Sequence, residues 1–246
     1  MLLSRLFIRP VAASLLLTLP GLAAAEPAPA DQTLSGPATL QPFTMHYKTR
    51  YEMGWFSFDI AGKRQLERLN DQRWRFSFDA EASIATLHES TEFILQEQQI
   101  QPLHYRYQTT GLLDKPTQTV VFAPAQQLIT DAQNNRLYPD IWQSGLQDSL
   151  SYMLQLSLDL AQGKTELNYP VFEKNKVREQ RFAVMAEESL NTALGTLQTL
   201  KVQQVRDDNK RQIYAWFAPA QQYQMVRLAY YEKGKLRYQI DVSAIE

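Results

Sequence analysis

Apolar and polar residues alternate with a period of two along most of this chain. The first regular run places apolar side chains at every second position, among them Phe43, Met45 and Tyr47, with Thr44, His46 and Lys48 between them. The same alternation runs through residues 56–60 and 74–80. This pattern is typical of antiparallel strands that bury one face and expose the other.

Further strands are expected after short turns. Turn-forming residues stand at 61–63, 69–72, 131–135, 174–176 and 232–234. The runs between them that have strand composition are 91–96, 103–109, 117–122, 127–130, 166–172, 177–184, 196–205, 212–218, 223–231 and 235–242. Many strands separated by tight turns indicate an all-β meander.

One amphipathic helix is expected to interrupt the strands, over residues 148–162. Asp148 or Ser149 can cap its start, and Gly163 stands where a left-handed C-terminal cap is needed. Apolar residues follow at helical spacing: Leu150, Met153, Leu154 and Leu158. The predicted fold is predominantly all-β, a long curved antiparallel meander or open barrel, with this helix packed on the concave face.

The first 25 residues have the three parts of a secretory signal peptide. Arg5 and Arg9 form a basic head, an apolar run follows over 11–19, and Ala23-Ala24-Ala25 supplies small residues for cleavage after Ala25. Residues 26–41, rich in Ala, Pro and small polar residues, are predicted to be a disordered leader, and 42–246 a single β domain. We therefore expect a periplasmic protein.

The composition argues against several classes of partner and anchor. Residues 1–25 hold two of the 25 basic residues and none of the 26 acidic ones, which leaves 23 against 26, a balance that does not favour nucleic acid. The chain has no Cys, which excludes disulfides and a lipid anchor on an N-terminal cysteine. No segment after the leader has the apolar length of a membrane span.

Catalytic signatures are missing from the sequence. His46, His88 and His104 have no metal-ligand spacing, and neither a nucleophile elbow nor a phosphate-binding glycine loop is present. The acidic pair at 207–208 is expected to be solvated in a hairpin turn. The pair at 187–188 precedes a strand and could flank a groove, but the sequence shows no pocket of the kind that acid–base catalysis needs. The sequence therefore predicts no catalytic residue, no metal, no cofactor and no enzymatic activity.

Aromatic residues are the compositional excess, with 11 Phe, 12 Tyr and 4 Trp. Most fall on alternate strand positions, where packing in a β core is the ordinary explanation. The functional alternative is that some of them line a groove for an amphipathic ligand on the concave face. The candidates for such a groove are Trp55, Trp142, Trp216, Tyr105 and Tyr107.

The second half of the chain resembles the family called domain of unknown function 3108 (DUF3108), found in exported bacterial proteins. The residues that carry the resemblance are 148–152 with Gly163, 188–202, 216–220, and 226–228 before the Lys-Gly-Lys turn at 233–235, while Met225 departs from a common Pro. The resemblance implies a long curved antiparallel sheet with helices against one face, similar in outline to the open-barrel carriers of bacterial lipoproteins. It implies no activity.

Two interpretations of function remain open from the sequence. One is a non-catalytic binding or carrier protein for an apolar or amphipathic, lipid-like envelope molecule. The other is an interaction module that docks on another envelope protein through an edge strand or loops. A hydrolase is a third, less favoured, class because no nucleophile or base can be named.

Overall fold

Fourteen strands form one antiparallel sheet, and a single α-helix lies against it. The computed structural model describes residues 40–246 except 54–55, 113–115 and 209, with backbone only over the remainder of 51–58. The described residues belong to one compact unit. The strands before the helix are β1 (Phe43–Met53), β2 (Phe56–Arg68), β3 (Arg73–Ala82), β4 (Ala85–Gln96), β5 (Gln99–Gly111), β6 (Gln118–Ala123), β7 (Leu128–Asp131) and β8 (Arg136–Tyr138).

The second half of the chain adds the helix and six more strands. They are α1 (Ser151–Ala161), β9 (Glu166–Glu173), β10 (Lys176–Thr192), β11 (Gly195–Val205), β12 (Arg211–Ala218), β13 (Gln224–Glu232) and β14 (Lys235–Ile245). Short 3-10 turns follow β6 and β12, at Pro124–Gln126 and Pro219–Gln221. The predicted all-β class and its one main helix are confirmed.

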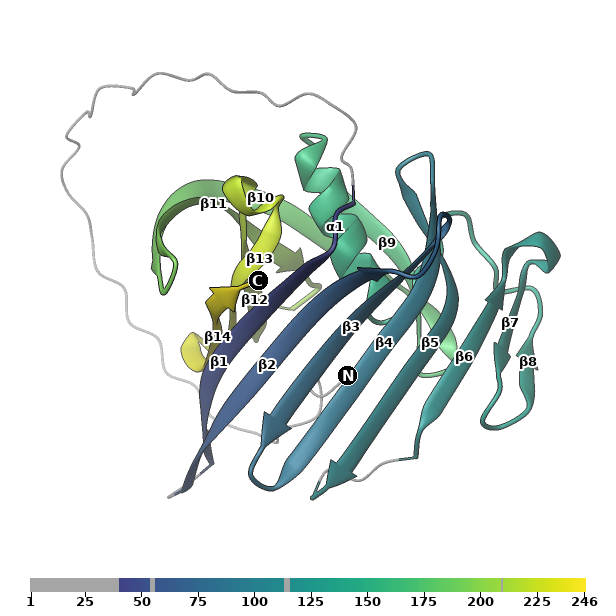
Figure 1. Ribbon diagram of the computed structural model, residues 1–246, viewed down its shortest axis with the longest axis horizontal. Coiled ribbons are helices and arrows are strands. Elements are labelled where there is room, and N and C mark those ends of the chain that lie inside the picture. The colour runs from purple at the N-terminus through teal and green to yellow at the C-terminus, as the bar shows by residue number, and fades with distance from the viewer. Residues whose placement is uncertain (1–39, 54–55, 113–115, 209) are drawn as a thin grey trace. The chain divides into compact units, whose positions relative to one another are not determined.

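The sheet consists of two hairpin ladders joined at one seam. Its strand order is β8-β7-β6-β5-β4-β3-β2-β1-β14-β13-β12-β11-β10-β9, so each ladder follows the chain and the seam is the pairing of β1 with β14. Figure 1 shows β1 to β8 as one broad ladder, with β14 to β11 curling away beyond β1 on the left and β9 running behind α1. The two predicted meanders therefore share one sheet.

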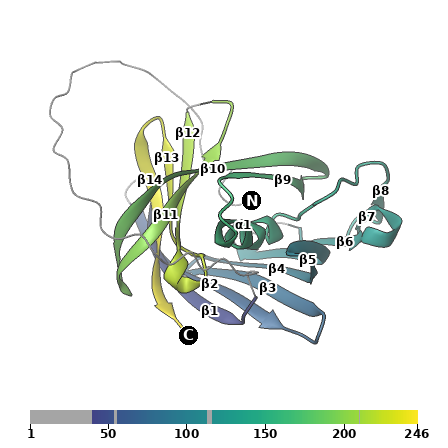
Figure 2. The same ribbon diagram turned by 90° about the horizontal axis from the view of Figure 1, so that it is seen from above.

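The sheet bends around the helix. Bulges interrupt the ladders at 46/47, 92/93, 184/186, 216/217 and 230/231, and bulges increase the local bend and twist of a strand. Seen from above, α1 lies between β9 and β10 on one side and β3 to β5 on the other (Figure 2). The predicted position of the helix on the concave face is confirmed.

Helix α1 is buried on more sides than an amphipathic stripe requires. Leu154, Leu156, Leu158 and Leu160 are all buried, and Leu156 and Leu160 join a core cluster with Leu167 and Tyr169 of β9. The helix starts three residues later than the predicted Asp148. At its other end Gly163 has a φ of +77°, and its N–H donates to the Leu160 carbonyl at 2.9 Å. This is the left-handed cap that the sequence predicts.

The sheet does not close into a barrel, but two glutamines bridge its gap. The Gln147 backbone pairs with β9 through Gln147 N to Pro170 O and Phe172 N to Gln147 O, both 2.8 Å. Its side-chain amide donates to the Ile100 carbonyl of β5 at 2.8 Å, and the Ile100 N–H donates to the Gln155 amide oxygen at 2.8 Å. Polar groups of the free part of β5 are thereby satisfied without a neighbouring strand.

Candidate functional site

A row of apolar, aromatic and charged side chains crosses strands β1 to β5. It lies on the face of the sheet that is turned toward α1, which we call the inner face. The pairings Met45 with Arg64, Arg64 with Phe78, Phe78 with Glu89 and Glu89 with Tyr107 place these five side chains on the same face. Arg64 and Glu89 are buried, at 3% and 6% exposed. A buried cation and a buried acid on an apolar sheet face are uncommon, because charged residues are rarely buried unless they are paired. This row is therefore the candidate site.

Arg64 is the unusual member of this row. None of its three side-chain nitrogens makes a hydrogen bond of good geometry among the described residues, although the Tyr47 hydroxyl lies near enough to interact with the guanidinium. Its guanidinium lies 4.9 Å from the centre of the Phe76 ring, a cation–π contact. It also lies close to the buried Tyr47 hydroxyl, which donates to the Met225 carbonyl at 2.7 Å; burial raises the pKa of Tyr47, and the charge of Arg64 opposes that rise.

Glu89 is held by a tyrosine. The Tyr105 hydroxyl donates to Glu89 Oε1 at 2.5 Å. Burial raises the pKa of Glu89, a rise that the hydrogen bond from Tyr105 opposes and the nearby Asp148 carboxyl reinforces. The pKa of the Tyr105 hydroxyl is also raised, by burial and by the negative charge of Glu89. Both shifts favour the protonated forms inside the sheet.

Asp148 connects this acid to the start of the helix. The backbone N–H groups of Leu150 and Ser151 each donate to Asp148 Oδ1 at 2.8 Å, and the Thr91 hydroxyl donates to Oδ2 at 2.6 Å. Burial raises the pKa of Asp148 even though these bonds act to lower it. The carboxyl group thus caps the first turn of α1 and ties it to β4.

The helix contributes Tyr152 to the same interior. Its ring stacks on Phe182 with 5.9 Å between centroids. Burial raises the pKa of Tyr152, Glu89 raises it further, and Arg64 opposes the rise, so the hydroxyl lies within the field of both charged side chains. We call the six residues Tyr47, Arg64, Glu89, Tyr105, Asp148 and Tyr152 the inner polar cluster.

Two hollows of the molecule lie outside this cluster and are lined mainly by polar residues. One, of about 900 Å³, has Lys48, Arg50, Asp59, Arg227 and Asp241 in its walls and is overhung by the tip of the β10–β11 hairpin. Because Lys48 and Arg50 alternate with Tyr47, they face away from the inner polar cluster. The other, of about 310 Å³, lies at the C-terminal end of α1.

In the smaller hollow the one buried acid of the helix is fully engaged. Asp159 accepts hydrogen bonds from Lys164 at 2.7 Å, Tyr169 at 2.8 Å and Gln155 at 3.1 Å. In the larger hollow Arg50 pairs with Asp59 at 2.9 Å, and Arg227 pairs with Asp241. The charged side chains named here thus have partners within the protein, and ordinary ion pairs and hydrogen bonds explain their presence in the two hollows.

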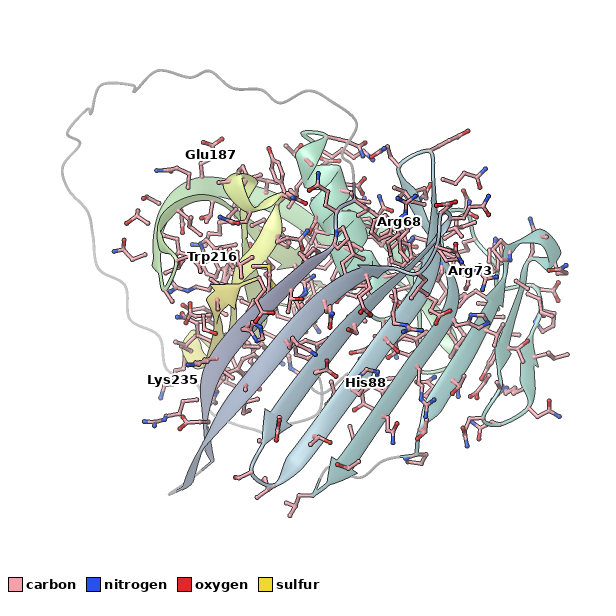
Figure 3. The ribbon with its side chains drawn as sticks, viewed as in Figure 1. Arg68, Arg73, His88, Glu187, Trp216 and Lys235 are labelled. Atoms are coloured by element: carbon pink, nitrogen blue, oxygen red, sulfur yellow. The ribbon has the colours of Figure 1, made fainter. Side chains whose placement is uncertain are left out.

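The five candidate residues from the sequence fall in different places. Tyr105 belongs to the inner polar cluster, and the buried Tyr107 lies beside Glu89 on β5. Trp142 is half-buried in the loop before α1. Trp216 is buried among the C-terminal strands (Figure 3), and its indole donates to Glu188 at 2.8 Å. Trp55 lies outside the described residues.

Sequence reasoning missed Arg64, Glu89 and Asp148 as interior charges. A signal was available for two of them, because Arg64 falls between Gly62 and Leu66 on the apolar parity of β2, and Glu89 between Leu87 and Thr91 on that of β4. A charged residue at an inward position of an alternating strand marks a buried charge. Asp148 was identified only as a helix cap.

The remaining polar candidates behave as surface groups. His46 contacts Glu246 at 3.0 Å, His88 contacts Asp79 at 2.6 Å, and His104 contacts Glu92 at 3.7 Å, so each imidazole lies beside a different acidic residue. Among the described residues, no group of three or more His, Asp or Glu side chains could hold a metal ion. No helix in the described part of the chain is long and apolar enough to cross a membrane.

A crystal structure of a β-barrel-like protein supports this fold independently. The protein, from Brucella abortus, belongs to domain of unknown function DUF1849; it matches with a TM-score of 0.57 at 8% identity, over 83% of this chain and 97% of its own. A DUF1329 family protein from Desulfovibrio piger matches over 87% of each chain at 10% identity, but its TM-score of 0.26 is too low to support any inference.

The sequence itself gives the family. The chain has no significant match among curated proteins. The model of the DUF3108 family, described as a protein of unknown function, matches residues 42–241 and so covers most of the strands and the helix. The chain therefore belongs to the DUF3108 family.

Proposed function

We propose that this protein is an exported, non-catalytic carrier of an amphipathic, lipid-like molecule of the cell envelope. The ligand lies against the inner face of β1 to β5, beside helix α1. The observation that carries the proposal is Arg64, a buried guanidinium with no acidic partner and no well-formed hydrogen bond in the described structure, packed against an aromatic ring. Ligand sites are mostly apolar with a few well-placed polar groups, and this face has that composition.

Export is part of the same proposal. Residues 1–25 serve as a signal peptide cleaved after Ala25, residues 26–41 as a leader, and residues 42–246 as the carrier domain in the periplasm. The inner polar cluster itself argues against catalysis. Glu89 and Asp148 are each engaged by hydrogen bonds from neighbouring residues, and neither lies in the walls of the two hollows described above.

The aromatic candidates take separate roles in this proposal. Tyr105 and Tyr107 belong to the polar end of the ligand site, and Trp142 to its mouth. Trp216 would have to give up its hydrogen bond to Glu188 before its indole could bind a ligand group. Trp142 is therefore the most informative of the tryptophans to replace.

Titration of the delipidated protein with a fluorescent fatty acid tests the carrier proposal. We expect saturable binding, which Trp142→Ala weakens while the far-UV circular dichroism spectrum is unchanged. Trp216→Phe is the matched control and should leave the affinity unchanged. Absence of saturable binding to any envelope lipid would contradict the proposal and favour docking on an envelope protein, the other function considered.

A further inference from the structure

The inner face holds a positive charge that the described structure leaves without a counter-ion. Arg64 is 3% exposed, no carboxylate pairs with it among the described residues, and its nearby Tyr47 hydroxyl is neutral and makes no hydrogen bond of good geometry with it. An arginine cannot release its proton at physiological pH, so burial cannot neutralise it. Buried charges in proteins are normally paired, because an unpaired one is strongly destabilising.

Glu89 does not fill this role. Phe78 separates it from Arg64 in the strand register, which puts the two side chains two strands, or about 10 Å, apart. Glu89 instead accepts the hydrogen bond of Tyr105. Burial raises its pKa and so favours its neutral form, which is the reverse of what a counter-ion of arginine would show.

The surroundings of Arg64 suit one end of an amphipathic molecule. The Phe76 ring lies against the guanidinium on one side, and the Tyr47 hydroxyl lies close by. The neighbour of Arg64 in the inward-facing row is Phe78 of β3, and Tyr107 of β5 lies in the same row on the far side of Glu89. An anionic group at Arg64 would therefore place an attached hydrocarbon chain against aromatic rings.

We propose that Arg64 is the anchor for the anionic group, a carboxylate or a phosphodiester, of an acidic amphiphile bound on the inner face. The proposal rests on the carrier function and specifies its ligand class. A guanidinium presents paired N–H donors that match carboxylate and phosphate oxygens, so an acidic headgroup supplies both the missing charge and the missing acceptors. Neutral amphiphiles supply neither the charge nor a bidentate acceptor.

The anchor has a signature in the ligand-free protein as well. Because its charge is unpaired there, Arg64→Leu should raise the Tm of the delipidated protein by a few degrees while it weakens binding of an acidic amphiphile. A purely structural arginine would do the opposite and lower the Tm on replacement. Arg73→Leu is the matched control, since Arg73 is exposed at the start of β3 (Figure 3) and should change neither quantity.

The test measures binding of hexadecanoic acid, hexadecanol and phosphatidylglycerol to the delipidated full-length protein, Arg64→Leu and Arg64→Lys. We expect the acid to bind about 10- to 100-fold more tightly than the alcohol, and this preference to vanish in Arg64→Leu. Arg64→Lys should retain part of it. Preference for the acid over phosphatidylglycerol would assign a carboxylate ligand, and the reverse a phosphodiester; both support the anchor.

Two results would overturn the anchor while the carrier function stands. They are equal affinity of the protein for acid and alcohol, and unchanged acid affinity in Arg64→Leu with a Tm that falls. If the unmodified protein binds none of the three amphiphiles, the carrier function itself fails. The experiment therefore separates failure of the anchor from failure of the function on which it rests.

Discussion

At the scale of single residues, burial acts differently on the acids and the base of the inner face. A carboxyl group can become neutral when it is desolvated, and the raised pKa values of Glu89 and Asp148 reflect this. Arg64 has no such option. Neither carboxyl group pairs with Arg64, and this lack of a counter-ion among the described residues is the basis of the proposed ligand preference.

The raised pKa of Glu89 predicts a pH dependence of stability. In the unfolded chain Glu89 ionises at its ordinary pKa, whereas in the folded protein it stays protonated to higher pH. The contribution of Glu89 to the free energy of unfolding is therefore highest below the pKa of Glu89 in the unfolded chain. It falls as the pH rises toward the pKa of Glu89 in the folded protein. Chemical denaturation across that range should show the fall in the natural protein and a smaller one in Glu89→Gln.

Glu92, on the outer face of the same strand, is the matched control with the opposite sign. The hydrogen bond from Arg75, at 2.7 Å, holds the pKa of Glu92 below its usual range. Its stabilising contribution is present above the unfolded pKa and is lost as pH falls through the folded one. If Glu89→Gln and Glu92→Gln change the pH profile in the same direction, the assignment of Glu89 as a buried, protonated acid is wrong.

Sequence reasoning predicted positions at this scale better than roles. The alternation placed Tyr47, Tyr105 and Tyr107 inward, as the structure confirms. It could not say that Tyr105 binds Glu89 or that the Trp216 indole binds Glu188, because both contacts depend on the cross-strand register. A one-residue shift of register would have moved every one of these side chains to the other face.

At the scale of elements, α1 is a core element. It is enclosed between the two halves of the sheet, and Leu154 at its centre is 0% exposed. The sequence predicted the helix and its C-terminal glycine, because spacing and capping are local signals. The boundaries of the strands were predicted less accurately: β4 begins at Ala85, six residues before the predicted start.

Leu154→Asp tests this burial. An unpaired carboxylate in the contact between α1 and the sheet should lower the free energy of unfolding by about 3–5 kcal/mol. Equilibrium denaturation measures the change. Leu112→Asp is the matched control, because Leu112 is 76% exposed and should change stability by less than about 0.5 kcal/mol. An unchanged Leu154→Asp protein would make the helix a surface element.

The glutamine bridge to β5 makes a second prediction for α1. Gln155→Leu leaves the buried Ile100 N–H without its acceptor and should cost about 1–3 kcal/mol. Hydrogen exchange at the Ile100 amide should become faster. Gln96→Leu serves as control, since Gln96 is exposed and its side-chain oxygen accepts a hydrogen bond from the Gln101 side chain. Equal effects of the two substitutions would show that the bridge does not stabilise the edge.

At the scale of the whole molecule, the seam between β1 and β14 decides the architecture. Met45 pairs with Ile245, and the Glu246 N–H donates to the Thr44 carbonyl at 2.9 Å, so the two ends of the described chain meet in one sheet. Turn residues predict hairpins between neighbouring strands, but no local signal specifies a pairing across the length of the chain. This is why the fold class and the curvature of the sheet could be predicted from the sequence, whereas the strand order could not.

The proposed ligand site depends on one charge, that of Arg64, and on the fold that places it. A bent sheet with a buried helix creates an inner face, the strand register sets Arg64 among aromatic rings on that face, and an acidic amphiphile would complete it. The DUF3108 family has no assigned function against which to compare this account. Binding of an acidic amphiphile at Arg64 must therefore be tested on protein that is purified together with its natural ligand.

Native mass spectrometry of the protein purified from the periplasm without detergent is that test. The account predicts a population heavier than the polypeptide by the mass of an acidic lipid-like molecule, which dissociates on collisional activation. The same preparation of Arg64→Leu should show the bare polypeptide, whereas Arg73→Leu should retain the ligand. A natural protein that carries no such mass, or that carries the same molecule as fully after Arg64→Leu, would contradict the account.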